Sequence, residues 1–368
     1  MTTKVKLALV LALVGCGGYE ARPAVPGPAA PPPDVTTPGA GAAAPTAAAP
    51  DADAPTTSQA PAVPIAEAVR AYVTESQSAW ASKDPKRFSA LYAPGAVVGT
   101  IGAKGWDEAT VADMDKQRAA YLASFPDLEL TYTRVVARGA YAVAEWVLTG
   151  TNKGDTAGPD GVVRKATNKK IGFRGATVVT FAPDGKVRRE SNYFDMGTMM
   201  GQLGLGPKGQ PVRPAEKKPS TPVEIAIGAD GDKDDAARAW LTAAMKGASE
   251  ITALASEDVV VSNQYMPTDT KGKKALTKEL TEGLKAFTDQ KSAIVMCVPA
   301  AQVIACEYTW TATWTGKAMG MSPTNKTGTV HSLEVLTFKD GKVAATHAYA
   351  NGAEFATAFG VGEEPAKK

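Results

Sequence analysis

The sequence predicts an α+β protein built from two tandem copies of one domain, in which N-terminal helices pack on a curved antiparallel sheet. Residues 184–204 align without a gap on residues 340–360, and Thr-Phe precedes each copy. Further upstream, residues 142–146 match residues 304–308 in spacing and pattern. In both copies helical periodicity comes first and β-rich runs follow, an order typical of α+β folds.

The chain begins with the pattern of a bacterial lipoprotein export signal. Two lysines precede an apolar run at residues 7–14, which ends in Leu-Val-Gly-Cys at Cys16. We expect removal of residues 1–15 and diacylation of Cys16, which would hold the protein on a membrane surface without spanning it. Gly17 follows the cysteine in place of aspartate, which favours the outer membrane of the cell envelope over the inner one. The alternative is an ordinary secretory signal in which the cysteine is incidental.

A long segment after the signal has the composition of a tether. It is rich in alanine, proline, glycine and threonine and has almost no large apolar side chains. Such a segment cannot bury enough apolar surface to offset its ordering entropy. This segment either is a stalk that lets the folded part work away from the lipid or is a linker with no role beyond attachment. The expected organisation is a signal at 1–15, a disordered tether at 16–64, a first domain at 65–206, a Lys/Pro-rich linker at 207–231, a divergent second domain at 232–362, and a disordered tail at 363–368.

The composition limits the partners. The chain has 40 Lys and Arg against 38 Asp and Glu, a formal net charge of +2. No basic stripe interrupts the apolar periodicity, so nucleic acid is not expected as a partner. No later apolar run is long enough to cross a bilayer, so the lipid anchor is the only membrane contact we expect.

Each domain is predicted as three helical segments followed by a strand meander. In the first copy, apolar residues recur at helical spacing from Ile65 to Trp80, and Pro85 ends that helix because the residue before proline avoids the α region. A short helix and a third helix, which Pro126 stops, come next. The predicted segments are helices at 65–83, 85–92 and 111–125 and strands at 128–137, 141–151, 171–181 and 187–194, with 236–245, 254–261 and 275–287 following the helical plan in the second copy and strands ending at Tyr349.

Several local motifs in the first copy occur together. They are Ser-Phe-Pro-Asp-Leu at 124–128, Leu-Thr-Gly-Thr-Asn-Lys-Gly at 148–154, and Asp-Gly-Lys-Val at 184–187, followed by Asp195 and Gln-Leu-Gly at 202–204. With these motifs the first copy resembles the SnoaL-like polyketide cyclase and ester cyclase group of the nuclear-transport-factor-2-like superfamily. The resemblance implies a cystatin-like cone, a curved sheet wrapped on a long helix with an apolar cavity. It also implies an acid or base carboxylate that assists aldol closure without a metal or an organic cofactor.

The position that matches the family's carboxylate is Asp195. A carboxylate in an apolar cavity loses hydration, which raises its pKa and suits it to proton transfer near neutral pH. The alternative is that Asp195 only caps the short helix at 196–203. In the second copy the aligned residue is Asn351, and an amide cannot act as a general base. We therefore interpret the second domain as a binding or scaffolding copy.

The expected cavity wall draws on aromatic and polar residues of both copies. By strand alternation, Tyr193 shares a face with Asp195 while Glu190 lies on the opposite face, and His347 shares a face with Tyr349 and Asn351. His347 is either a proton carrier or a hydrogen-bonded wall residue, and the aromatic residues line a cavity or pack in a core. The candidate ligand-cavity residues are Tyr121, Trp146, Phe173, Tyr193, His347, Tyr349 and Asn351.

Cys297 and Cys306 flank a predicted turn and would lie nearly opposite each other on neighbouring strands. Their aligned positions in the first copy hold Val135 and Ala144, so both cysteines replace an apolar pair. Export favours a disulfide, and two buried free thiols are the alternative until the register is known. With two cysteines and no histidine at ligand spacing, no metal site is expected.

Two functions follow from these patterns. The first is a membrane-anchored lipoprotein whose cone cavity binds a small apolar or polyketide-like molecule without chemistry. The second is a cofactor-independent cyclase or isomerase that uses Asp195 as general acid or base. Biosynthetic cyclases normally work in the cytoplasm, so the export signal favours the binding function. The two domains are expected to pair through their sheets within one chain, or two whole chains to pair in that way.

Overall fold

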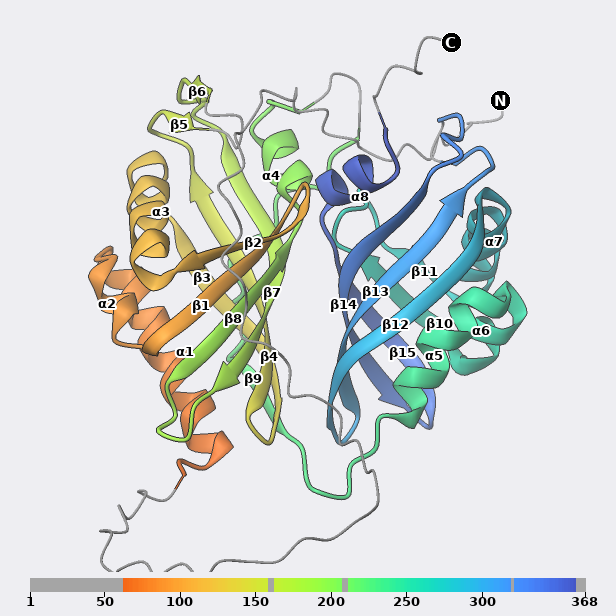
Figure 1. Ribbon diagram of the computed structural model, residues 1–368, viewed down its shortest axis with the longest axis horizontal. Coiled ribbons are helices and arrows are strands. Elements are labelled where there is room, and N and C mark those ends of the chain that lie inside the picture. Colours follow the sequence, from red (N-terminus) through yellow and green to blue (C-terminus); the bar gives the residue numbers. More distant parts are fainter. Residues whose placement is uncertain (1–61, 158–161, 207–210, 319–320, 362–368) are drawn as a thin grey trace, which may run out of the picture. The chain divides into compact units, whose positions relative to one another are not determined.

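Figure 1 shows the computed structural model, which describes residues 62–157, 162–206, 211–318 and 321–361. The predicted signal with Cys16, nearly all of the predicted tether and the tail at 363–368 lie outside the described residues. Within them, two sheets are each preceded by helices, and the predicted tandem α+β fold is confirmed.

In the first repeat, helices cover one face of a seven-stranded sheet (Figure 1). The strand order is β2-β1-β8-β7-β4-β3-β9. Its helices are α1 (Ile65–Ser82), α2 (Lys86–Ser89), α3 (Val111–Ser124) and α4 (Met196–Gln202). Its strands are β1 (Tyr92–Gly102), β2 (Gly105–Thr110), β3 (Glu129–Arg138), β4 (Tyr141–Thr151), β7 (Lys170–Phe181), β8 (Val187–Phe194) and β9 (Glu224–Ile227), with a small hairpin of β5 (Thr156–Ala157) and β6 (Val163–Arg164).

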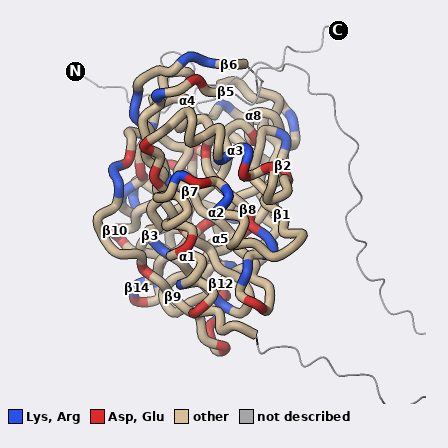
Figure 2. The backbone as a smooth tube through the Cα atoms, turned by 90° about the vertical axis from the view of Figure 1, so that its left-hand side faces the viewer, with Lys and Arg blue, Asp and Glu red and all other residues tan. Residues whose placement is uncertain are grey.

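The second repeat has the same order of elements around a six-stranded sheet, β11-β10-β15-β14-β13-β12. Its helices are α5 (Asp235–Lys246), α6 (Ala248–Leu254), α7 (Lys273–Ala286) and α8 (Gly352–Ala358). Its strands are β10 (Ala255–Asn263), β11 (Thr270–Lys271), β12 (Phe287–Ala300), β13 (Val303–Trp314), β14 (Thr327–Lys339) and β15 (Lys342–Tyr349). Figure 2 shows basic and acidic residues interspersed over the side of the molecule that carries α1, α2 and α3.

The sheets are mixed, which corrects the expectation of antiparallel sheets. β1 runs parallel to β8, and β10 runs parallel to β15. Sequence analysis missed β1 because Pro94 and Gly95 have the composition of a turn, whereas in the structure they form a bulge where the register with β8 shifts. The helix expected at 254–261 is strand β10, because a run of three valines favours a strand and a short apolar run does not reveal its period.

The outer faces of the two sheets pack against each other and form a shared apolar core. From the first sheet this core contains Val136, Val143 and Val178, and from the second it contains Val298 and Val335. The segment expected as a linker takes part, because β9 pairs with β3 at the edge of the first sheet. Both repeats and part of the connection therefore form one packed unit.

The disulfide left open by sequence analysis is present. Cys297 and Cys306 face each other on β12 and β13, with a Cα–Cα distance of 4.1 Å. Val135 and Ala144 are paired in the same way on β3 and β4. The disulfide therefore replaces an apolar cross-strand pair at an equivalent place in the fold.

Candidate functional site

Asp195 directly follows β8 and is the N-cap residue of α4. Its buried carboxylate accepts hydrogen bonds from the backbone N–H groups of Gly197 (3.3 Å) and Thr198 (2.7 Å) and from the Thr198 hydroxyl (2.7 Å). The backbone N–H of Gly352, in the second repeat, donates a fourth bond at 3.0 Å. Burial raises the pKa of Asp195, although these hydrogen bonds oppose the rise. This is the geometry of the capping alternative.

Asn351 has the corresponding role in the second repeat. Its side-chain oxygen caps α8 by accepting the N–H of Ala353 at 3.0 Å. Its amide nitrogen donates to the backbone oxygen of Ile101 in the first repeat at 2.7 Å. Asp195 and Asn351 therefore both cap a helix and both bond across to the other repeat. Because either residue can cap a helix, the capping role explains why the first repeat has aspartate at this position and the second has asparagine.

Strand alternation identified the two faces of β8 correctly, but the face expected to point into the cone points out of it. Tyr193 lies in the core shared by the two sheets. On the opposite face, Glu190 accepts a hydrogen bond from the Tyr92 hydroxyl at 2.6 Å, and Arg118 donates to that hydroxyl at 2.8 Å. The buried carboxylate on the inner face of the first sheet is therefore Glu190, which the sequence marked only by its alternation with Asp195.

The predicted cavity residues divide between two places. Trp146 and Phe173 are buried in the first core with Tyr121 packed against it, as the core alternative expected. Tyr193 and Tyr349 lie in the core between the sheets, and Asn351 and His347 also bond across to the first repeat. These seven residues do not line a single site.

A buried glutamate also lies on the inner face of the second sheet. Glu334 accepts hydrogen bonds from the indole N–H of Trp240 at 3.0 Å and from the Tyr308 hydroxyl at 3.4 Å. Burial raises the pKa of Glu334 despite these donors. Sequence analysis did not identify it, because a single glutamate in a strand carries no motif.

Two tyrosine–glutamate pairs connect the sheets reciprocally. The Tyr349 hydroxyl donates to Glu145 at 2.6 Å, and the Tyr193 hydroxyl donates to Glu307. The internal repeat aligns Tyr193 with Tyr349 and Glu145 with Glu307. The pairs are therefore equivalent positions of one pseudosymmetric interface.

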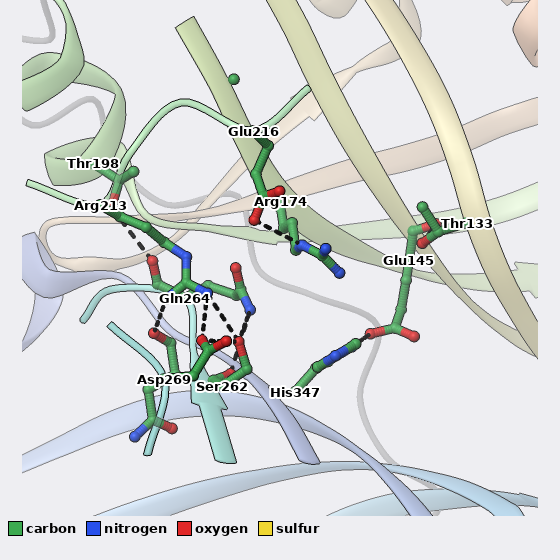
Figure 3. A network of polar contacts seen from close by, with 12 residues as sticks. Thr133, Glu145, Arg174, Thr198, Arg213, Glu216, Ser262, Gln264, Asp269 and His347 are labelled. Atoms are coloured by element: carbon green, nitrogen blue, oxygen red, sulfur yellow. Dashed lines mark hydrogen bonds and ion pairs between the residues drawn. The ribbon is translucent and has the colours of Figure 1, made fainter. Parts of the chain in front are cut away.

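Glu145 is the centre of a polar network between the repeats, and Figure 3 shows its contact with His347. Besides Tyr349, it contacts Nδ1 of His347 at 2.7 Å and the guanidinium of Arg134 at 3.6 Å. Burial alone would raise the pKa of Glu145, but the charge of His347, the hydrogen bonds and Arg134 outweigh it and lower that pKa. The carboxylate is therefore held ionised in a buried position.

A pocket of about 300 Å³ opens beside this network. Its walls come from both repeats and from the segment that joins them. The charged side chains that line it are Arg134, Glu145, Arg174, Glu216, Lys217 and His347. A second hollow, beside Asp195, measures about 10 Å³, which is room for one water molecule and not for an organic ligand.

In the part of the chain that the structure describes, no group of three or more His, Cys, Asp and Glu side chains is arranged to hold a metal ion. Among the same residues, no helix is both long and apolar enough to cross a membrane.

Comparison with known proteins gives a family match in both repeats. The model of a family described as SnoaL-like polyketide cyclase matches residues 67–203 and 234–358. A search among curated proteins finds no match for this chain.

Several solved structures each match about a third of this chain. AclR of Streptomyces galilaeus is 25% identical, with a TM-score of 0.32, and the match covers 36% of this chain and 84% of AclR. TsrD of Streptomyces laurentii is 18% identical, with a TM-score of 0.32 and coverage of 38% and 96%. A protein with a ketosteroid isomerase-like fold from Catenulispora acidiphila is 11% identical, with a TM-score of 0.31 and coverage of 34% and 92%.

Proposed function

We propose that this chain, which belongs to the SnoaL-like polyketide cyclase family, is a lipid-anchored envelope protein that binds a small molecule without proton transfer at Asp195. The observation that carries the proposal is the hydrogen bonding of Asp195. A carboxylate offers about four lone-pair sites, and here four protein donors are directed at it. A general base needs a free lone pair that faces a substrate.

The alternative function, a cofactor-independent cyclase or isomerase, would require Asp195 to exchange these donors for a substrate. Two of the donors are the N–H groups of Gly197 and Thr198 in the first turn of α4, which would then lose their cap. A third belongs to Gly352 at the start of α8, so the exchange would also loosen a contact between the repeats. Ligand binding without chemistry needs no such rearrangement.

Replacement of Asp195 by asparagine tests this proposal. We expect Asp195→Asn to retain the same co-purifying small molecule when the protein, isolated from its own host in detergent, is analysed by native mass spectrometry. The free energy of unfolding should fall by about 1–3 kcal/mol, because the amide keeps one acceptor oxygen and its NH2 group faces two of the four donors that now bond to the carboxylate.

The pH dependence gives a second readout for the same variant. The folded-state pKa of Asp195 lies above its ordinary value of 3.8, so ionised Asp195 weakens the native state as pH rises through and above that value. The stability of Asp195→Asn relative to wild type should therefore improve between pH 4 and pH 7, as followed by urea unfolding. If wild type converts the bound molecule and Asp195→Asn does not, the cyclase function is established instead.

The envelope location is proposed from the export signal and from the Cys297–Cys306 disulfide, since disulfides persist mainly in oxidising compartments. We expect the full chain, expressed in a Gram-negative host supplied with labelled palmitate, to become labelled and to sediment with membranes. Cys16→Ser should remove both the label and the sedimentation. A Cys297→Ser, Cys306→Ser variant serves as the control and should stay labelled. Equal labelling of wild type and Cys16→Ser would contradict the anchor.

A further inference from the structure

The pocket between the repeats lies at one of two pseudosymmetric positions. Near the Tyr193–Glu307 pair, the hairpin of β1 and β2 carries Trp106, whose ring centroid lies 5.3 Å from Tyr193 and 5.7 Å from His331. The indole therefore covers that position.

At the Tyr349–Glu145 pair the covering element is different. The corresponding hairpin of the second repeat ends in β11, which has only two residues. The joining segment takes its place, and residues from Glu216 to Thr221 form one wall of the pocket. An equivalent position that is filled in one half of the molecule is thus open in the other.

The charges in the pocket favour an anion. Glu145 is already engaged by Tyr349, His347 and Arg134. Of the two remaining permanent cations in the wall, Arg174 uses only its Nε, which donates to Glu216 at 3.1 Å. Its terminal nitrogens make no hydrogen bond within the described residues. The two arginines and one lysine exceed the two glutamates by one positive charge.

Size and lining indicate an organic ligand. A volume of about 300 Å³ lies at the lower end of small-molecule sites. Thr221 offers a hydroxyl, and Val147 and Pro219 offer apolar contact. A guanidinium whose two terminal nitrogens are free can bind a planar carboxylate in bidentate fashion through that one edge, and a nearby ammonium adds a point charge.

We propose that this pocket binds a small organic carboxylate, with Arg174 and Lys217 as its anion-binding groups. The proposal rests on the proposed binding function and specifies its site and ligand chemistry. The ligand would lie between the first sheet, the joining segment and His347 of the second repeat (Figure 3), so that only the tandem chain assembles the site.

The test is calorimetric titration of the full chain with hydroxybutyrate, its neutral counterpart hydroxybutyramide, and inorganic phosphate. We expect saturable binding of hydroxybutyrate and none of the amide. Arg174→Gln should weaken hydroxybutyrate binding by about tenfold or more, which is typical for loss of a hydrogen-bonded charge. Lys217 is exposed, so its replacement does not disturb the core. Lys217→Gln should weaken hydroxybutyrate binding by about threefold.

Arg189→Gln is the matched control, because Arg189 is an exposed arginine of the same sheet that pairs with Glu108 outside the pocket. It should bind hydroxybutyrate like wild type. Binding that both Arg174→Gln and Lys217→Gln leave unchanged would overturn the site, and so would binding of phosphate alone or of no probe.

The two proposals can fail separately. If the molecule that co-purifies with wild type remains on Arg174→Gln at equal occupancy, the pocket assignment is wrong while the binding function stands. If wild type carries no small molecule from its host and binds none of the probes, the binding function itself fails.

Discussion

Glu145→Ala is expected to lower the free energy of unfolding by about 3–5 kcal/mol, the usual cost of removing one partner from a buried charged network. Glu145 is 2% exposed and accepts hydrogen bonds from the other repeat. Its removal leaves the buried Tyr349 hydroxyl without its acceptor and the Arg134 charge without one of its carboxylates. Urea unfolding of the full chain, followed by tryptophan fluorescence, measures the loss.

Glu224→Ala is the control for Glu145→Ala. Glu224 pairs with the same arginine, Arg134, at 3.0 Å, but its side chain is 54% exposed. An exposed ion pair contributes at most about 1 kcal/mol, so this variant should unfold nearly like wild type. Equal losses in both variants would show that the buried network between the repeats is not a major source of stability.

The cost of Glu145→Ala should also depend on pH. The folded-state pKa of Glu145 lies below its ordinary value of 4.5, so its ionised form stabilises the native state fully above that value. This stabilisation is lost as pH falls from 4.5 through the lowered folded-state pKa. The difference between wild type and Glu145→Ala should therefore shrink on acidification below pH 4.5.

Arg213→Ala is expected to cost about 3 kcal/mol and also to weaken ligand binding. Arg213 belongs to the segment that joins the repeats and is 9% exposed. Its guanidinium donates to Asp269 at 2.6 Å, to Ser262 at 3.0 Å and to the backbone oxygen of Met266 at 3.0 Å, all in the second repeat. Without these bonds, the segment that carries Lys217 into the pocket loses its attachment to the second repeat. We expect hydroxybutyrate binding to weaken several-fold by the same calorimetric titration.

Lys218→Ala provides the comparison from the same segment. Lys218 pairs with Glu129 at the surface, and its side chain is 56% exposed. Its loss should change the free energy of unfolding by less than about 0.5 kcal/mol. Wild-type stability and affinity in Arg213→Ala would mean that the bonds of Arg213 to the second repeat do not hold the joining segment in place.

Most of the fold was predictable because it depends on local patterns that occur twice. The alignment of residues 184–204 on 340–360 established the duplication, and periodicity located most of the helices and the central strands. Strands β1 and β10 were missed because Pro94 and Gly95 have the composition of a turn and because a short apolar run does not reveal its period. Both segments are strands through parallel pairing with β8 and β15, which lie far away in the chain. No short-range pattern in the sequence records such a pairing.

The candidate site was much less predictable. Alternation correctly separated Glu190 from Tyr193, but it does not say which face of a strand lies inside a domain. The pocket depends on Glu145, Arg174 and Lys217, which come from two strands and the joining segment and form no motif. The sequence shows that the second repeat has no tryptophan corresponding to Trp106. It does not show that this difference leaves room for a pocket beside Glu145.

By itself, the sequence determined that one domain occurs twice and which residues could form helices, cap them or form a disulfide, because these properties depend on neighbours in the chain or on the aligned copy. Only the tertiary structure decided that Asp195 bonds to the other repeat and that an open, charged pocket lies beside Glu145. The physical reason is that both depend on how two outer sheet faces pack, and that packing is set by contacts between residues about 150 to 200 positions apart.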